Sequence, residues 1–132
     1  MIVLDTNVVS EPLRVEPNPD VMSWLSQQTQ AKITAVTMSE LLIGVLLLPA
    51  GARRDRLHAA LRAVEFDVLP FDAEAADAYA HMHTRRRAAG APLSVQDGMI
   101  AAICLTHGAT LATRNIRDFA DLGVDLVNPW EP

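Results

Sequence analysis

The 132-residue sequence contains one cysteine, Cys104, one lysine, Lys32, and only 5% aromatic residues. A single cysteine excludes an intrachain disulfide and favours a reducing compartment, so we expect a cytoplasmic protein in which Cys104 is a buried apolar residue. Because aromatic side chains are scarce, Ala, Leu, Val and Ile must fill the core. The length fits one domain that covers residues 1–132.

Long apolar runs are also missing. The longest, residues 41–49, is interrupted by Gly44 and is far shorter than the roughly 20 residues that a membrane span requires. The opening run Ile2-Val3-Leu4 has no basic segment before it and meets Asp5 at once, which argues against a signal peptide. We therefore expect no membrane association.

Positive charge is scarce, since the net charge is −5 with a pI near 5.2. This balance argues against a protein that coats nucleic acid through bulk charge. Basic residues nevertheless cluster, as at Arg85-Arg86-Arg87 and near Arg114. A solvated helix face is the ordinary interpretation of such clusters, and local contact with phosphate is the alternative.

Strand and helix signals alternate along the chain. Strands are expected over residues 2–4, 31–36, 67–71, 109–113 and 126–127. Helical segments are expected over residues 18–25, 41–48, 53–64, 72–89, 94–107 and 115–119, the second of them started by a capping box, Thr37-x-x-Glu40. Strands separated by helices indicate an α/β fold with a mostly parallel sheet and helices on both faces.

Four carboxylates lie where strands give way to the following segments. In open α/β sheets, ligands bind beyond the carboxyl ends of the strands, so these acids are expected to meet at one edge. The four are Asp5 after the first strand, Glu40 in the first turn after the second, Asp97 in the first turn of the 94–107 helix, and Asp118 after the fourth strand. Flanking polar residues that could supply further ligands or hold water are Thr6, Asn7, Ser94, Thr113 and Asn115.

Capping alone could explain three of these acids. Glu40, Asp97 and Asp118 each follow a Thr, Ser or Asn by three residues, and an acid in a first helical turn contributes a few tenths to about 1 kcal/mol. Asp5 stabilises nothing at the end of a doubly buried strand unless it caps the next turn through Thr6 and Asn7. A functional interpretation is favoured by the arrival of all four at the same edge of one sheet.

Converging carboxylates repel one another and resist joint ionisation unless a cation is present. The sequence offers no CxxC and no histidine pair on one helix face, so zinc is disfavoured, whereas Mg²⁺ or Mn²⁺ prefers carboxylate oxygens. Such an ion activates water and stabilises charge on phosphate oxygens. The predicted chemistry is therefore phosphodiester hydrolysis, with Asp5 and Asp97 as principal ligands and Asp118 and Glu40 completing the shell or orienting the water.

Four sequence blocks resemble those of a PIN domain, in the usual order: MIVLDTNVVSE, TMSELLIG, SVQDGMIAA and ATRNIRDF. The closing NPW is similar to the VapC and FitB-like branch. The resemblance covers essentially the whole chain and implies a three-layer α/β/α domain that binds Mg²⁺ or Mn²⁺ and cuts RNA as the toxin of a toxin–antitoxin pair. It also implies a homodimer held inactive by an antitoxin protein.

By the same resemblance, particular residues acquire roles. Asp5, Glu40, Asp97 and Asp118 match the metal-binding catalytic acids, and Asn7, Thr113 and Asn115 match supporting polar positions. From the arginine clusters we single out candidate contacts for RNA phosphates: Arg85, Arg86, Arg87 and Arg114.

Other functions remain open at this point. An aspartyl phosphatase would need a second acid where Asn7 stands, and a receiver domain would need a late lysine, whereas Lys32 is early. The main alternative is a catalytically silent PIN-fold scaffold that binds proteins. An apolar groove between residues 41–48 and 53–64 would suit an antitoxin helix, although core packing or a dimer face could equally use those leucines.

Overall fold

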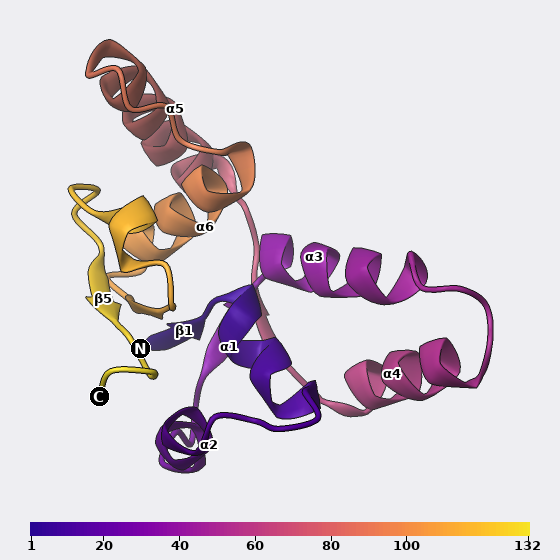
Figure 1. Cartoon of the computed structure of the whole chain (residues 1–132). Coiled ribbons are helices and arrows are strands. Elements are labelled where there is room, and N and C mark those ends of the chain that lie inside the picture. The colour runs from indigo at the N-terminus through magenta and orange to yellow at the C-terminus, as the bar shows by residue number, and fades with distance from the viewer.

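A computed structural model describes all 132 residues around a five-stranded sheet whose neighbouring strands are all parallel (Figure 1). The strand order is β3-β2-β1-β4-β5. The strands are β1 (Ile2–Leu4), β2 (Lys32–Thr34), β3 (Asp67–Leu69), β4 (Thr110–Ala112) and β5 (Asp125–Val127). The strands predicted from the sequence are therefore present, and the sheet is entirely parallel.

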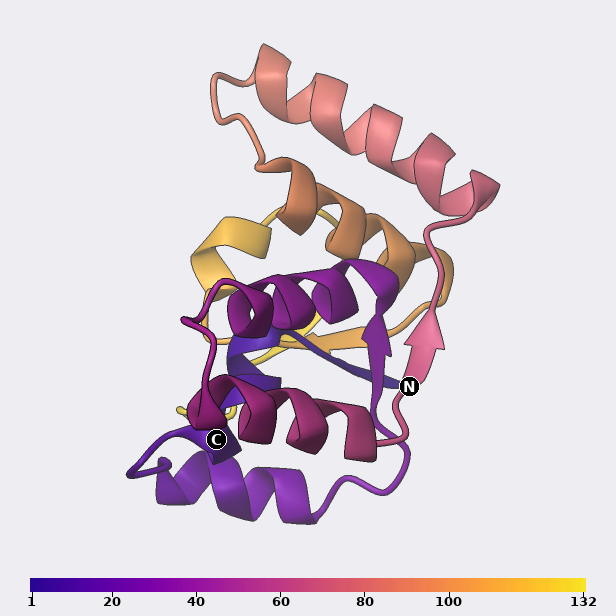
Figure 2. The ribbon, with the colours of Figure 1, turned by 90° about the vertical axis from the view of Figure 1, so that its right-hand side faces the viewer.

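Helices cover both faces of this sheet, which confirms the predicted three-layer α/β/α architecture. The helical elements are α1 (Thr6–Ser10), η1 (Glu11–Leu13), α2 (Pro19–Ser26), α3 (Ala35–Leu46), α4 (Ala52–Ala63), α5 (Ala73–Ala88), α6 (Val95–Thr106) and η2 (Ile116–Phe119). α6 lies against one face with α5 outside it, and α1 and α2 lie on the other side (Figures 1 and 2).

The central strand β1 shows why both faces must be covered. Val3 belongs to the core shared with α5 and α6, whereas Leu4 belongs to the smaller core shared with α1 and α2. Successive side chains of a strand point to opposite faces, so an unbroken apolar run buries both. A third cluster, formed by Leu41, Val45 and Leu61, joins α3 to α4 in a hairpin that extends beyond the sheet (Figure 1).

The direction of α6 follows from the short turn that joins it to β4. Gly108, with φ of 59°, makes this turn in the left-handed region that favours glycine. Because the turn enters β4 at its amino end, α6 runs back across the sheet, and its N-terminus with Asp97 lies toward the carboxyl ends of the strands. Its 12 residues span about 18 Å, more than the length of the three-residue strands.

Two sequence-based predictions about helix starts are wrong. The strand predicted over residues 31–36 ends at Thr34, whose hydroxyl accepts the Thr37 amide at 3.0 Å and caps α3. Thr37 is therefore inside the helix rather than its cap, and Glu40 lies beyond the first turn. Asn115 makes no side-chain cap for η2; its carbonyl instead accepts the Asp118 amide at 3.0 Å.

Other helix starts agree with the sequence. Asn18 accepts amide bonds at the start of α2, where Pro19 is the first helical residue. Asp72 caps α5 and Ser94 caps α6, at the first residues of the predicted segments 72–89 and 94–107. The short helix α1 was not anticipated, because residues 6–10 carry no apolar repeat. No helix combines the length and apolar character that a membrane span would need.

Thr34→Ala should lower the free energy of unfolding by about 1–2 kcal/mol, because the buried Thr37 amide loses its acceptor. Urea unfolding followed by circular dichroism measures this change. Ser39→Ala is the matched control, since it removes an exposed hydroxyl that donates to the Val36 carbonyl, and its effect should stay within about 0.5 kcal/mol. Equal losses in both variants would show that Thr34 does not cap α3.

Candidate functional site

Asp5 lies at the carboxyl end of β1 and is the most firmly held of the four acids. Its side chain is 5% exposed, and its amide continues the β1–β4 ladder by donating to the Ala112 carbonyl at 2.9 Å. Oδ1 accepts the Thr6 amide at 2.8 Å, and Oδ2 accepts the Thr113 hydroxyl at 2.7 Å. Asp5 therefore does cap α1, and it is also fixed from the neighbouring strand.

Thr113 connects the ends of two strands. Leu4 pairs with Ala112, so the next residues, Asp5 and Thr113, lie side by side at the sheet edge. The fully buried Thr113 hydroxyl donates to Asp5 and accepts the Asn115 amide at 3.0 Å. Its hydrogen-bonding capacity is thus used to tie the chain leaving β4 to the carboxylate at the end of β1.

Glu40 comes from α3 rather than from a strand end. Its Oε1 accepts the Thr6 hydroxyl at 3.1 Å, which connects α3 to α1 just beyond Asp5. The carboxylate is partly buried and retains Oε2 for another partner. Glu40 therefore reaches the same region as Asp5, although from one turn farther along its helix than the sequence pattern indicated.

Asp97 lies in the first turn of α6, where its amide donates to the Ser94 hydroxyl at 3.2 Å. The next residue, Gly98, is needed for packing: a Cβ there would approach Tyr79 Cε2 to 2.6 Å. Tyr79 belongs to α5 and stacks edge-on against Phe71. The missing side chain at Gly98 thus lets α5 and α6 approach closely and sets the position of Asp97.

Asp118 lies in η2 and is exposed. Its amide donates to the Asn115 carbonyl, and the segment is anchored by the buried side chains of Phe119 and Leu122. Asp118 therefore projects from a short turn whose other side is part of the main core.

The electrostatics of the site show that the acids sense one another. Burial is the largest cause that raises the pKa of Asp5, Glu40 and Asp97 above its ordinary value. The charges of Asp97 and Asp118 also raise the pKa of Asp5, and Asp118 raises that of Asp97. Glu40 is affected in the same direction by Asp5 and Asp97. The structure thus brings the four predicted acids within electrostatic range of one another.

Oxygen donors of this kind suit a hard divalent ion. The carboxylates do not form a closed cluster, because no three His, Cys, Asp or Glu side chains lie close enough together to make a complete metal site. Asn7 Oδ1 is buried without a hydrogen-bond partner, as expected of an acceptor whose donor is not part of the protein chain. Carboxylate and amide oxygens are the donor types that Mg²⁺ or Mn²⁺ prefers, and Asn7 lies two residues after Asp5 in the sequence.

Cys104, toward the C-terminal end of α6, is buried in the main core. Burial and the charge of Asp5 raise the pKa of its thiol to about 12, so it remains a neutral apolar residue, as predicted.

The four arginines chosen from the sequence differ in their surroundings. Arg85 and Arg87 are exposed, and Arg114 places its guanidinium carbon 5.1 Å from the ring centre of Trp130. Arg86 instead binds the backbone of its own chain with its guanidinium group. Exposed positions for an RNA contact are therefore Arg85, Arg87 and Arg114, whereas Arg86 departs from that expectation.

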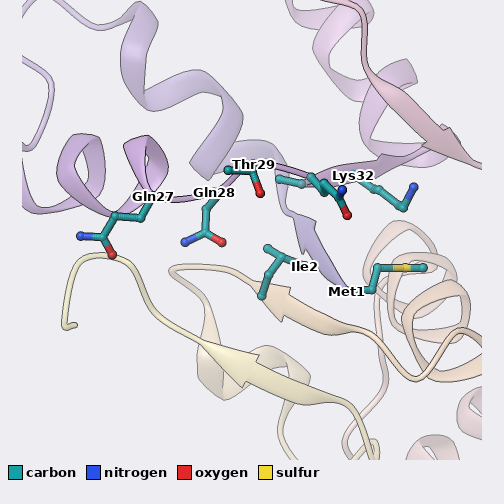
Figure 3. A pocket seen from close by; sticks show the side chains of 8 residues that line it. Met1, Ile2, Gln27, Gln28, Thr29 and Lys32 are labelled. Carbon is teal, nitrogen blue, oxygen red and sulfur yellow. The ribbon is translucent and has the colours of Figure 1, made fainter.

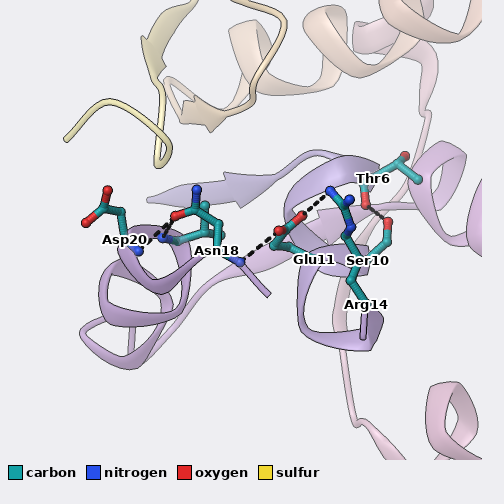
Figure 4. A network of polar contacts seen from close by, with 7 residues as sticks. Thr6, Ser10, Glu11, Arg14, Asn18 and Asp20 are labelled. Atoms are coloured by element: carbon teal, nitrogen blue, oxygen red, sulfur yellow. Dashed lines mark hydrogen bonds and ion pairs between the residues drawn. The ribbon is translucent and has the colours of Figure 1, made fainter. Parts of the chain in front are cut away.

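Glu11 is a buried acid that the sequence patterns did not single out. It is 4% exposed, accepts the Asn18 amide at 2.9 Å, and pairs with Arg14 at 3.6 Å (Figure 4). Asn18 in turn caps α2. Glu11 thus fixes the loop between α1 and α2, and no spacing signal could have found it, because its partner is set by the loop path.

A hollow at the opposite edge of the sheet is unrelated to the acids. It has a volume of ≈ 410 Å³ and is lined by Met1, Ile2 and residues 27–32, at the amino ends of β1 and β2 (Figure 3). Ligands of parallel sheets bind at the carboxyl ends, so this hollow is not the predicted site.

Comparison with known proteins agrees with this geometry. A family model described as PIN domain matches residues 2–124. VapC ribonuclease Y4jK of Sinorhizobium fredii is 40% identical, with 100% of this chain and 99% of that protein covered. Toxin FitB of Neisseria gonorrhoeae is 38% identical, with 98% and 99% covered.

The fold comparison gives the same result. The solved structure of FitAB bound to an IR36 DNA fragment contains a chain that matches with a TM-score of 0.93 and 37% identity, covering 98% of this chain and 96% of that one. The resemblance noted from the four sequence blocks is thereby confirmed. This chain belongs to the PIN domain family, in the group that contains the VapC and FitB proteins.

Proposed function

We propose that this protein is the ribonuclease toxin of a toxin–antitoxin pair and that it hydrolyses RNA phosphodiester bonds with Mg²⁺ or Mn²⁺. The observation that carries the proposal is the convergence, at the carboxyl edge of the sheet, of acids from four separate segments: Asp5, Glu40, Asp97 and Asp118. Full-length similarity to a VapC ribonuclease and to toxin FitB supports it.

Each acid has a distinct task in this proposal. Asp5 is fixed from two sides, so its remaining lone pairs have defined directions toward an ion. Asp97 completes the principal ligand pair. Glu40, tied by one oxygen to Thr6, and Asp118, exposed on its turn, complete the shell or orient the attacking water.

The bound ion supplies positive charge that promotes deprotonation of water and stabilises negative charge on the phosphate. Arg85, Arg87 and Arg114 are proposed to contact neighbouring phosphates, which lets a protein of net charge −5 bind RNA locally. We also propose the homodimer implied by the family resemblance.

A second proposal concerns the antitoxin. A hollow of ≈ 270 Å³ opens between α1, α3 and α4. Its lining includes Thr6, Glu40, Gly44 and Arg53, and the apolar part is Leu13, Leu41, Val45, Leu48, Leu57 and Leu61. Ile43 on α3 and Leu47 directly after it are exposed, the latter by 80%. We propose that an amphipathic antitoxin helix covers this groove. Because Glu40 lines it, an occupant would contact the acid site directly.

Cleavage of a panel of structured RNAs tests the nuclease. We expect cutting with Mg²⁺ or Mn²⁺ and none with EDTA. Asp97→Asn should reduce the cleavage rate at least about 100-fold, because losing a metal ligand should cost more than the about 10–100-fold typical of losing a residue that supports a ligand. Absence of cutting with either ion, together with no change in melting temperature on adding it, would favour the catalytically silent scaffold.

The stability of the metal-free protein gives an independent test. Since the pKa of Asp97 is raised by burial and by Asp118, its ionised form destabilises the fold at neutral pH. Asp97→Asn should therefore melt at an equal or higher temperature at pH 7, and the difference should vanish below the ordinary pKa of 3.8. Asp72→Ala, which removes only a cap, should lose about 1 kcal/mol. A similar loss in Asp97→Asn would identify Asp97 as a cap.

Gly44→Phe tests the groove. A Cβ at Gly44 meets no atom within 4 Å, so the ring should fill the groove without disturbing the fold. We expect binding of the cognate antitoxin, measured by calorimetry, to weaken at least about tenfold, the equivalent of 1.4 kcal/mol. Ala76→Phe on the exposed side of α5 is the bulk-matched control. Equal antitoxin binding by the two variants would exclude this groove.

A further inference from the structure

Arg86, in the last turn of α5, differs from the exposed arginines on either side of it. Each of its three guanidinium nitrogens donates to a backbone carbonyl: Nε to Ala91 at 3.0 Å, Nη1 to Ala120 at 3.2 Å, and Nη2 to Asp118 at 3.0 Å. The Arg86 carbonyl also accepts the Ala91 amide at 2.9 Å. One side chain thus joins two segments. The first, at Ala91, lies 5 residues along the chain, and the second, at Asp118 and Ala120, lies 32 and 34 residues along it.

Neither segment belongs to a long helix or to a strand. Asp118 lies in the four-residue helix η2, Ala120 follows directly after it, and Asp121 adopts φ of 63°, an uncommon value for a residue other than glycine. Residues 89–94 form the loop that leads to Ser94, the cap of α6. Carbonyls in such turns have no helix or strand partners, so a side chain that binds them fixes the path of the backbone.

We infer that Arg86 is a positioning residue that holds Asp118 at the acid edge by binding the backbone of its turn. This inference rests on the proposed function, in which Asp118 serves the metal site. The same guanidinium holds the loop that precedes Asp97, so it sets the spacing between the two acids contributed by the C-terminal half of the chain.

The shape of the guanidinium matters for this role. Its planar fork donates in several fixed directions, whereas the ammonium group of lysine is a compact charge that cannot serve three separated carbonyls at once. Arg86→Lys therefore preserves the charge and removes the geometry. At an arginine that only contacts RNA phosphate, substitution by lysine should have a small effect, because lysine keeps the positive charge that attracts phosphate.

The test combines two measurements on full-length Arg86→Lys and Arg86→Met, with Arg85→Lys and Arg87→Lys as matched controls. Arg86 binds the carbonyls of Ala91, Asp118 and Ala120, whose amides donate to the carbonyls of Arg86, Asn115 and Arg117. Loss of the side-chain bonds should let these turns open more often, so amide hydrogen exchange in the metal-free protein should accelerate about tenfold or more at the three amides while β4 and α6 keep their protection. Mn²⁺ binding, measured by calorimetry, should weaken about tenfold. The controls should change neither quantity.

The outcomes separate the inference from the function on which it rests. Unchanged exchange in Arg86→Lys overturns the tether, and faster exchange with unchanged Mn²⁺ binding overturns the positioning role. Arg86→Met removes the charge as well, so if it fails to fold, the lysine variant alone decides. Failure of the wild-type protein to bind Mn²⁺ would overturn the proposed function, and the exchange data would still report separately whether Arg86 holds the turn.

Discussion

The buried hydrogen bond from Thr113 to Asp5 is the interaction on which the rest of the site depends. Parallel pairing of β1 with β4 brings these residues together, although 108 positions separate them in the chain. The bond gives Oδ2 of the buried carboxylate a donor, as the Thr6 amide does for Oδ1, and without such donors its burial would be strongly unfavourable. Because the same hydroxyl accepts the Asn115 amide, it also directs the chain from β4 toward the turn that carries Asp118.

Acids gathered at this edge oppose folding, and other contacts compensate. Burial and mutual repulsion disfavour ionised Asp5, Glu40 and Asp97, as their raised pKa values indicate. The apolar face of α6 is fully buried against the sheet, and Gly98 lets α5 pack closely on its other side. A well-packed core of this kind can hold a locally unfavourable arrangement of charge, which a bound cation would relieve.

The sequence predicted much of the fold because its signals were local. Unbroken apolar runs identified β1 and its neighbours. The predicted segments 18–25 and 72–89 begin at Asn18 and Asp72, which are the residues that cap α2 and α5. The assignment of Thr37 as a cap failed because Thr34, three residues earlier, offers the same hydroxyl and is where the strand ends. Arg86 appeared equivalent to its neighbours, since a run of three arginines contains nothing that distinguishes the one with backbone partners.

The sequence by itself determined the alternation of strands and helices, the placement of acids after strands, and the family to which the chain belongs. These features depend on residue type and spacing, which short-range propensity and side-chain periodicity translate directly into structure. Only the tertiary structure decided that Thr113 binds Asp5, that Glu40 reaches the site from the second turn of its helix, and that Glu11 and Arg86 hold loops. Except for the Glu11–Asn18 bond, which depends on the path of one loop, those contacts join residues far apart in the chain, so they exist only once the sheet and its covering helices have set the distances between them.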